Sequence, residues 1–458
     1  MKIKKYIVLG IWLGGVIFCA FFLLKFLQKT AHRNIVFVTV DALRADHLSC
    51  YGYKRITSPN IDKLAGEGVS FLNFFATSCT TQHATPALFT GKYLGVYSLE
   101  VLTKSFNNVL DDKFTTLAEY LKGFNYETAA FLENVHLRSG TGFEQGFNTY
   151  KDFSGNAQSI TDKVITFLKN YRSKKPFFIW VHYVDVHSPY FSPEDPIGLF
   201  AGDSLYKEGN EILKLNLDDN SSPYRSKGYI PKIVFRKGHY SLNYYIACYD
   251  AAIRYVDFHI GRLLKNVDKN TLIIVTADHG ESLGEHDTYF HHENLYDEAL
   301  HVPLIIKNNN FFKGGITVSQ PACSIDIVPT VLREIDPLKY FFIKKNLNGI
   351  DLKLMVRNKN IRRPYIYFYA PGIHGVRNTD ENIKYSITNN KKEELYYMPD
   401  ENNNLASRSS RSVPSLLEAM RSNADAWYKN YPIRSDVNLT EIDPDKKIKD
   451  EARKMGYW

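Results

Sequence analysis

The chain has 458 residues, of which 44% are hydrophobic, 14% aromatic and 23% charged, a composition that excludes a disordered or fibrous protein. Its formal net charge is +8, but six of the 57 basic residues lie within residues 1–33, which hold no acidic residue. The rest of the chain therefore has 51 basic and 49 acidic residues. A charge excess confined to one terminal segment removes the main argument for nucleic acid as a partner.

The first 33 residues have the pattern of a membrane anchor. Residues 6–24 carry no charge over 19 positions, enough for one helix across a hydrocarbon core of roughly 30 Å, and lysines flank both ends. No small-residue cleavage site follows, which disfavours the alternative of a cleaved signal peptide. We expect a single-pass membrane protein whose catalytic domain is extracytoplasmic, either periplasmic or at the cell surface. The basic residues are equal on the two sides and do not set the orientation.

The cysteines leave two possibilities open. Cys19 lies in the predicted anchor, and Cys50, Cys79, Cys248 and Cys323 are widely spaced, with no CxxC motif. The four outside the anchor are either buried thiols or form one or two disulfides in an oxidising compartment.

Strand-like and helix-like segments alternate along the central part of the chain. Continuous apolar runs, typical of strands buried on both faces, occupy residues 34–40, 176–181, 271–276 and 302–306. An apolar stripe over 246–263 predicts a helix. This alternation predicts an α/β fold with a large, mostly parallel sheet flanked by helices.

A smaller unit follows. Aromatic and apolar runs at 364–369, 384–387 and 394–397 predict a small C-terminal antiparallel sheet. The predicted organisation is an anchor over 1–33, a catalytic domain over 34–358, a C-terminal subdomain over 359–430 and a tail over 431–458.

Acidic and histidine residues follow three of the predicted strands. They are Asp41, then His182, Asp185 and His187, then Asp278 and His279. Ligands of open α/β sheets bind beyond the carboxyl ends of the strands, and carboxylate with imidazole binds divalent cations. The sequence therefore predicts a metal site built from Asp41, Asp278 and His279.

Several longer motifs occur in one order along most of the chain. They occupy residues 40–53, 58–71, 177–190, 271–286, 291–298, 324–330 and 394–405. Taken together, over about residues 34–406, they resemble the sulfatase family of the alkaline phosphatase superfamily. The resemblance implies an alkaline phosphatase-like fold and an anionic ester substrate carried by a lipid, a glycan or a small molecule.

The resemblance also locates a nucleophile. In sulfatases it is a cysteine of Cys-x-Pro-Ser-Arg, oxidised to formylglycine, nine residues before the threonine of Leu-x-Thr-Gly. Counting back from Thr90 gives Thr81, with Thr80 as the alternative. The residues after Cys79 lack the proline and arginine that the oxidation needs, so we do not expect formylglycine there. The alternative is a purely structural role, in which these threonines only cap the following helix.

A threonine nucleophile changes the expected chemistry. Formylglycine hydrate expels sulfate by breaking its own C–O bond, whereas a sulfated threonine needs attack at sulfur. A phosphothreonine can be attacked by water or by an acceptor alcohol. The chain thus resembles the phosphoethanolamine transferases and phosphohydrolases of the superfamily, with one divalent cation (Zn, Mn or Ca) bound by Asp41, Thr81, Asp278 and His279.

The resemblance assigns supporting roles to further histidines. His187 is expected to contact the transferred group or to protonate the leaving oxygen, and His136 matches another histidine of the family. His291 and His292 stand where the family has a lysine or histidine, and the sequence does not distinguish them. Histidine suits these roles because its pKa lies near neutrality.

Three departures from the family pattern matter. Ala42, Asn134 and Thr85 replace an aspartate, a lysine and an arginine of the family. The leading hypothesis is therefore a membrane-anchored, metal-dependent hydrolase of phosphate or sulfate esters with a covalent threonine intermediate. The alternatives are a phosphoethanolamine- or phosphoglycerol-type transferase, a sulfuric ester hydrolase, and a degenerate member that binds a glycan or lipid.

Overall fold

The structure is a computed structural model. It describes residues 33–93, 110–153, 155–200, 202–203, 211–215, 228–308, 314–406 and 413–430. The predicted membrane segment at 6–24 and the predicted tail at 431–458 lie outside these residues. Within the part of the chain that is described, no helix is both long enough and apolar enough to cross a membrane.

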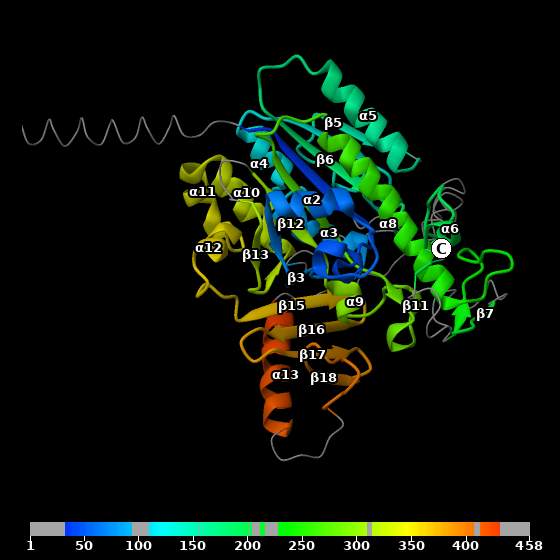
Figure 1. The fold of residues 1–458 in the computed structure, drawn as a ribbon. Helices are drawn as coiled ribbons and strands as arrows, with labels where there is room; N and C mark the ends of the chain where they lie inside the picture. The colour runs from blue at the N-terminus through cyan, green and yellow to red at the C-terminus, as the bar shows by residue number, and fades with distance from the viewer. Residues whose placement is uncertain are drawn as a thin grey trace, which may run out of the picture.

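The core is an eight-stranded sheet with the strand order β13-β2-β12-β9-β1-β6-β4-β5 (Figure 1). Its strands are β1 (Ile35–Val40), β2 (Val69–Phe71), β4 (Glu127–Leu132), β5 (Thr149–Asp152), β6 (Phe177–Tyr183), β9 (Leu272–Ala277), β12 (Leu304–Lys307) and β13 (Ile316–Val318). All neighbours are parallel except β12, which runs antiparallel to both β9 and β2. The predicted fold class is confirmed, because the sheet is large, mixed and mostly parallel.

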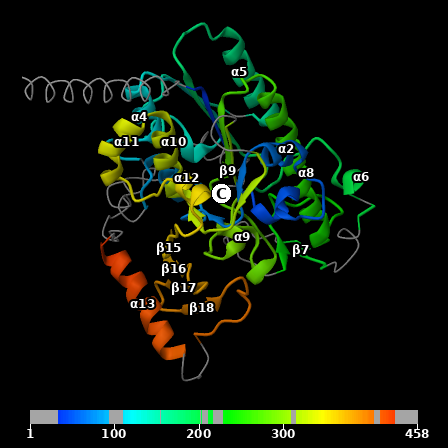
Figure 2. The same ribbon diagram turned by 60° about the vertical axis from the view of Figure 1, so that its left-hand side comes forward.

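Helices cover both faces of this sheet (Figures 1 and 2). One packed group consists of α2 (Pro59–Glu67), α5 (Ala157–Asn170) and α8 (Leu242–Leu264). The other contains α3 (Thr81–Thr90), α4 (Leu117–Gly123), α10 (Ile327–Ile335), α11 (Pro337–Ile343) and α12 (Leu352–Arg357). In the central strands between them, all residues of β1, β6 and β9 are buried, which explains their continuous apolar sequences.

Shorter elements surround the main sheet. They are α6 (Pro196–Phe200), α9 (Asp297–Leu300) and the two-stranded pairs β3 (Phe74–Phe75) with β14 (Ala322–Cys323), β7 (Lys214–Leu215) with β8 (Tyr229–Ile230), and β10 (Ser282–Leu283) with β11 (Tyr289–His291).

The C-terminal unit is an antiparallel sheet with one helix against it. Its strands are β15 (Tyr365–Ala370), β16 (Ile373–Asn378), β17 (Ile383–Thr388) and β18 (Glu393–Tyr397), and α13 (Val413–Asn430) packs on β16 and β17. The amide of Tyr369 donates to the carbonyl of Thr77, just before α3. This small sheet therefore supports the loop that leads to the predicted nucleophile.

Two details differ from the expectations. Helix α8 begins at Leu242 rather than near residue 246, because the Ser241 side chain accepts a hydrogen bond from the Tyr244 amide and caps the first turn. The cysteines in the described residues, Cys50, Cys79, Cys248 and Cys323, are all free thiols. Of the two possibilities left open, the disulfides are excluded for these four.

Candidate active site

The predicted site residues meet at the carboxyl edge of the central strands. Strands β9 and β6 are the two parallel neighbours of β1, with Val40 opposite Ala277 and Thr39 opposite His182. Asp41 and Asp278 each follow the last residue of their strand. The shared direction of the strands brings these side chains to one edge, where α/β sheets bind ligands.

A buried acidic group forms the floor of the site. One ligand atom each from Asp41, His182 and Asp278 lies within 4.8 Å of the others, and all three side chains are buried. His279 adjoins the group, with Nε2 3.3 Å from Asp41 Oδ1 and 3.7 Å from Asp278 Oδ2.

The two carboxylates of this group differ in their pKa. Burial alone would raise the pKa of Asp41, but the charges of His187, His279 and His182 hold it below its ordinary value. The pKa of Asp278 is raised, first by burial and then by the neighbouring charge of Asp41. Two adjacent buried carboxylates are costly unless a positive charge compensates them.

The same group is suited to a divalent cation. Asp278 Oδ2 is buried and has no hydrogen bond from any described residue. The donor set of two carboxylates and imidazole nitrogen suits zinc or manganese. Asp41, His182 and Asp278 could therefore hold the ion, with His279 and the Thr81 hydroxyl beside them.

His182 was not predicted as a ligand, although its position after an apolar run was noticed. Its ring is oriented by Thr39, whose Oγ1 lies 2.8 Å from His182 Nδ1 and accepts the Trp180 indole N–H at 2.9 Å. These contacts leave His182 Nε2 3.5 Å from Asp41 Oδ2. The sequence could have predicted His182 as a ligand, because it lies near the carboxyl end of an apolar run that forms the strand leading to the site.

Thr81 is the first residue of α3, directly after the N-cap residue Thr80. Its Oγ1 lies 3.4 Å from Asp41 Oδ2 and 3.3 Å from His279 Nε2. The first N–H groups of a helix have no partner within the helix and favour negative charge at this end. The Thr81 hydroxyl therefore lies where both a cation and a helix terminus can stabilise an alkoxide or an anionic ester.

The neighbouring alternatives are placed differently. Thr80 Oγ1 lies 2.7 Å from His83 Nδ1, a local contact within the first turn. Cys79 is buried in the hydrophobic core, and burial raises the pKa of its thiol to about 12. Of these three residues, Thr81 is the one whose hydroxyl contacts the acidic group.

Asn134 completes the acidic side of the site. Its Nδ2 donates to Asp41 Oδ2 at 2.7 Å and lies 3.5 Å from Thr81 Oγ1. A neutral donor that contacts Asp41 thus stands where the family has a lysine. His136, two residues later, donates its amide N–H to Asn134 Oδ1, and burial lowers the pKa of its ring to about 4.

Three histidine rings lie close together along the opposite side, in tilted and edge-on arrangements. The ring centroid of His292 lies 4.2 Å from that of His279 and 5.1 Å from that of His187. His291 instead directs Nε2 to Glu293 Oε1 at 3.3 Å. His292 is therefore the one of the pair that lies within the site. Burial, with the neighbouring His279 and His291, holds the pKa of His292 well below its ordinary value, so its ring is neutral.

Glu281 is a further buried group that the sequence did not single out. Its carboxylate lies 3.5 Å from His292 Nδ1 and accepts a weak hydrogen bond from the Ser188 amide at 3.4 Å. Burial raises its pKa. Its position directly after Asp278-His279-Gly280 could have identified Glu281 as a site residue. Glu281 orients His292 and, through Ser188, the loop that carries His187.

Arg44 and Asp46 form a structural ion pair beside the site. The Arg44 guanidinium donates Nε to Asp46 Oδ1 at 2.9 Å and Nη2 to Asp46 Oδ2 at 2.8 Å. It also donates Nη1 to the Glu281 carbonyl and to Glu285. This cation therefore ties together the loops after β1 and β9 and is already committed to these acceptors.

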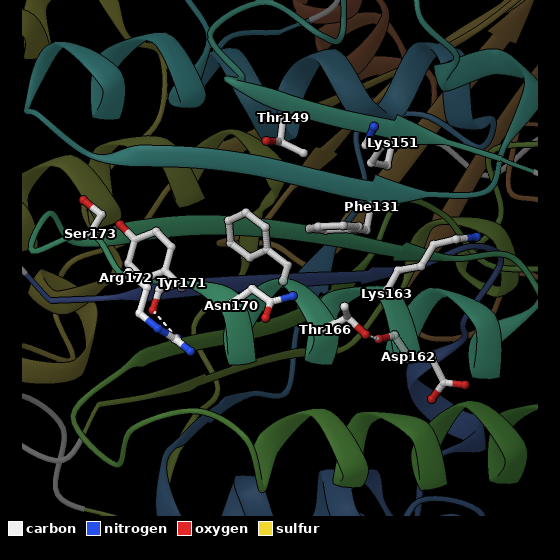
Figure 3. A pocket seen from close by; sticks show the side chains of 11 residues that line it. Phe131, Thr149, Lys151, Asp162, Lys163, Thr166, Asn170, Tyr171, Arg172 and Ser173 are labelled. Atoms are coloured by element: carbon white, nitrogen blue, oxygen red, sulfur yellow. Dashed lines mark hydrogen bonds between the residues drawn. The ribbon is translucent and has the colours of Figure 1, made fainter.

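A separate cavity of about 780 Å³ lies between α5 and strands β4 and β5. Phe131 and Phe167 form part of its wall, and Lys151, Lys163 and Arg172 lie around it (Figure 3). None of the predicted site residues lines it, so it is not the catalytic cleft.

Comparisons with known proteins give one consistent result. A sequence model of the sulfatase family matches residues 33–336. N-acetylglucosamine-6-O-sulfatase of Bacteroides thetaiotaomicron is 24% identical over 91% of this chain and 90% of its own length. Human iduronate 2-sulfatase is 26% identical over 65% of this chain and 62% of its own length.

Solved structures agree on the fold. A protein in complex with its substrate D-glucosamine-2-N,6-O-disulfate superposes with a TM-score of 0.68 at 21% identity, over 88% of this chain and 99% of that one. The phosphonate monoester hydrolase of Agrobacterium radiobacter gives 0.67 at 18% identity, over 87% and 96%. With the family motifs, the sheet topology and the acidic site at its carboxyl edge, these matches establish that the chain is a member of the sulfatase family and a hydrolase of that family.

Proposed function

We propose that this protein is a membrane-anchored, divalent cation-dependent hydrolase that cleaves phosphate esters through a covalent intermediate on Thr81. The observation that carries the proposal is the position of the Thr81 hydroxyl, at a helix N-terminus and 3.4 Å from Asp41 Oδ2. A hydroxyl in this place has a proton acceptor beside it and an electropositive environment for the charge that develops.

Different side chains act as nucleophile and as proton donor in the first half of the reaction. Thr81 Oγ1 attacks phosphorus and passes its proton to His279 Nε2, which lies 3.3 Å away, and the bond from phosphorus to the leaving oxygen breaks. The leaving oxygen takes a proton from His187, whose Nδ1 lies 2.7 Å from the Ser188 carbonyl, so that exchange with the substrate falls to Nε2. A bound cation would polarise a phosphoryl oxygen and lower the pKa of the Thr81 hydroxyl.

The second half of the reaction regenerates the enzyme. Water attacks the phosphothreonine and gives a proton back to His187. As the bond between phosphorus and Thr81 Oγ1 breaks, Thr81 Oγ1 takes back the proton that it lost in the first half of the reaction. His292 has a depressed pKa and acts as a neutral hydrogen-bonding group beside the transferred group. An acceptor alcohol in place of water would make the same site a transferase.

Sulfate ester hydrolysis is the second candidate. It is favoured by the relatives, which are named as sulfatases of N-acetylglucosamine and iduronate units. A sulfated Thr81 would need attack by water at sulfur, because the side chain carries no second hydroxyl to expel the sulfate. The absence of the family's Cys-x-Pro-Ser-Arg motif at 81–85 is the reason that we place phosphate first.

The test compares neighbouring threonines in the full chain. Aryl phosphate, phosphodiester and aryl sulfate hydrolysis are measured with added zinc, manganese or calcium for wild type, Thr81→Ala, Thr81→Ser and Thr80→Ala. We expect Thr81→Ala to lose at least about a thousandfold in rate, Thr81→Ser to retain activity, and Thr80→Ala to stay close to wild type. Acid quenching during turnover should trap phosphate on Thr81.

Two results would contradict the proposal. Equal rates for wild type and Thr81→Ala on every ester would remove Thr81 as the nucleophile. Turnover of the aryl sulfate alone, with sulfate trapped on the same residue, would replace the phosphate proposal by the sulfate one.

A further inference from the structure

One apolar surface of the protein lies away from the catalytic site, on α11. Leu338, Phe341 and Phe342 are 48%, 60% and 66% exposed. Both views place this helix at the periphery of the molecule, on the outer side of α10 (Figures 1 and 2). Adjacent exposed aromatic side chains of this size mark interaction surfaces rather than ordinary protein surface. We call these three side chains the α11 face.

The charge that borders the α11 face is mostly positive, although the N-cap residue Asp336 pairs with Lys339. Residues 337–347 contain three lysines and no acidic residue. Lys344 Nζ lies 4.7 Å from the centre of the Phe341 ring, and Lys345 beside it is exposed. An apolar face bordered by lysines is the pattern of a helix that lies in the interface of an anionic membrane.

The chain enters the described structure beside this face. Arg33 Nη1 donates to Glu334 Oε1 at 2.8 Å and to Asn308 Oδ1 at 2.9 Å. Glu334 lies in the last turn of α10, and α11 begins at Pro337. The first described residue is therefore tied to the element that immediately precedes the α11 face.

Chain length limits how far this face can be from the proposed anchor. Eight residues, 25–32, separate the uncharged segment at 6–24 from Arg33. A fully extended chain of that length spans at most about 30 Å. If residues 6–24 cross a bilayer, Arg33 lies within that distance of its surface, and α11 begins three residues after the Glu334 that Arg33 contacts.

We propose that the α11 face docks onto the lipid bilayer in which the N-terminal segment is anchored, inserting Phe341 and Phe342 among the headgroups. This inference rests on the membrane anchoring in the proposed function and adds a second attachment point, which fixes the orientation of the catalytic domain. A second copy of the chain is a poorer occupant. A two-fold contact would bring Lys344 and Lys345 near their own copies, and a stable dimer buries about 800 Å² per partner, far more than three side chains.

The test uses the full chain reconstituted into phosphatidylcholine vesicles with a minority of phosphatidylglycerol. Tryptophan is introduced by Phe342→Trp and, as a matched control, by Phe258→Trp, since Phe258 is 57% exposed on α8. Emission is compared with the parent protein in vesicles with and without lipids brominated in the upper half of the acyl chain. We expect the added emission of Phe342→Trp to be largely lost with brominated lipid, and that of Phe258→Trp to be unchanged.

A charge variant supplies the second arm. Combining Lys344→Glu with Lys345→Glu should reduce the quenching at position 342 in vesicles that contain phosphatidylglycerol. Equal quenching at positions 342 and 258 would overturn the docking, and a dimer lost on Phe342→Ser would reassign the face to a second copy. Failure of the full chain to float with the vesicles would overturn docking and anchoring together. Hydrolysis of a soluble ester, measured in parallel, should be unchanged in all these variants, so loss of docking is separable from loss of the proposed chemistry.

Discussion

Neutralising Asp278 should stabilise the protein without metal and abolish its stabilisation by metal. Asp278→Asn keeps the Oδ1 atom that accepts the His279 amide at 2.9 Å, so the local turn is preserved. The substitution removes the negative charge opposite Asp41. A structural role for the carboxylate predicts destabilisation under all conditions, whereas a ligand role predicts effects of opposite sign with and without the cation.

The magnitude follows from the separation of the two carboxylates. Their ligand oxygens lie within 4.8 Å. At an effective dielectric constant of about 20, two like charges at that distance repel by roughly 3 kcal/mol, an upper value because the neighbouring histidines offset part of it. A domain of about 400 residues has an unfolding entropy of about 0.8 kcal/mol per kelvin, so the full effect corresponds to a Tm increase of about 4 °C.

Saturating metal should make the Tm of the wild type higher than that of Asp278→Asn. A cation at one thousand times its Kd stabilises the wild type by about 4.1 kcal/mol, or about 5 °C, which exceeds the gain of about 4 °C from the substitution, and Asp278→Asn should lose most of this stabilisation by metal. The assay is thermal unfolding of the full chain with a chelator and with zinc, manganese or calcium. Asp380→Asn is the control, because Asp380 is exposed and pairs with Arg362, which is not a site residue. A lower Tm for Asp278→Asn in chelator, with the metal shift retained, would refute the reasoning.

Three further predictions concern pH, packing and positioning. Burial raises the pKa of Asp185 from 3.8 to about 7, so the folded state keeps a proton that the unfolded chain releases. The stability of the wild type should therefore fall as the pH rises from about 4 to 7, and the urea midpoint of Asp185→Asn should rise relative to that of the wild type over this range. Asp250 accepts hydrogen bonds from Tyr53 and the buried Arg55 and pairs with His47. Asp250→Ala should cost about 3 kcal/mol, measured by urea unfolding, which is the lower end for a broken buried ion pair because Arg55 keeps Asp203 as a second partner. The Tyr249 hydroxyl donates to the Ala42 carbonyl at 2.7 Å and accepts a hydrogen bond from the Arg44 amide at 2.9 Å, and so holds the loop that follows Asp41. Tyr249→Phe should therefore weaken cation binding by about 1–3 kcal/mol in calorimetric titrations, while the circular dichroism spectrum stays unchanged.

Strands with continuous apolar or aromatic runs were predictable, both in the main sheet and as β15, β17 and β18 of the small sheet, whereas β16 was not. The runs that became β1, β6, β9 and β12 are continuous and apolar, since helices lie on both sides of the sheet. Strand β16 was missed, because it contains His374, Gly375 and Arg377. Gly375 is required by a close approach of β17: a Cβ atom there would lie 2.5 Å from the Tyr385 carbonyl oxygen. The buried role of Arg377, which pairs with Asp297, depends on contacts across the fold.

The site was predictable where its residues follow a strand and unpredictable where it depends on side-chain direction. Asp41, Asp278 and His279 are placed together by the parallel order of the strands. Choosing His292 over His291 required the ring positions, because adjacent residues point to different sides of the chain. The roles assigned to Thr81, His136, His187 and the other site residues remain predictions for the mutants to decide.

The two ends of β1 bear on which esters can reach the site. Its amino end follows Arg33, which is tied to Glu334 beside the α11 face, and its carboxyl end leads into Asp41. A six-residue strand rises about 20 Å. If the α11 face rests on the bilayer, the acidic site lies at the edge of the sheet that is turned away from the membrane. Lipid headgroups in the supporting bilayer would then be out of its reach, whereas an ester on a glycan or a small molecule would approach from solution. This geometry favours hydrolysis of such esters over transfer of a lipid headgroup.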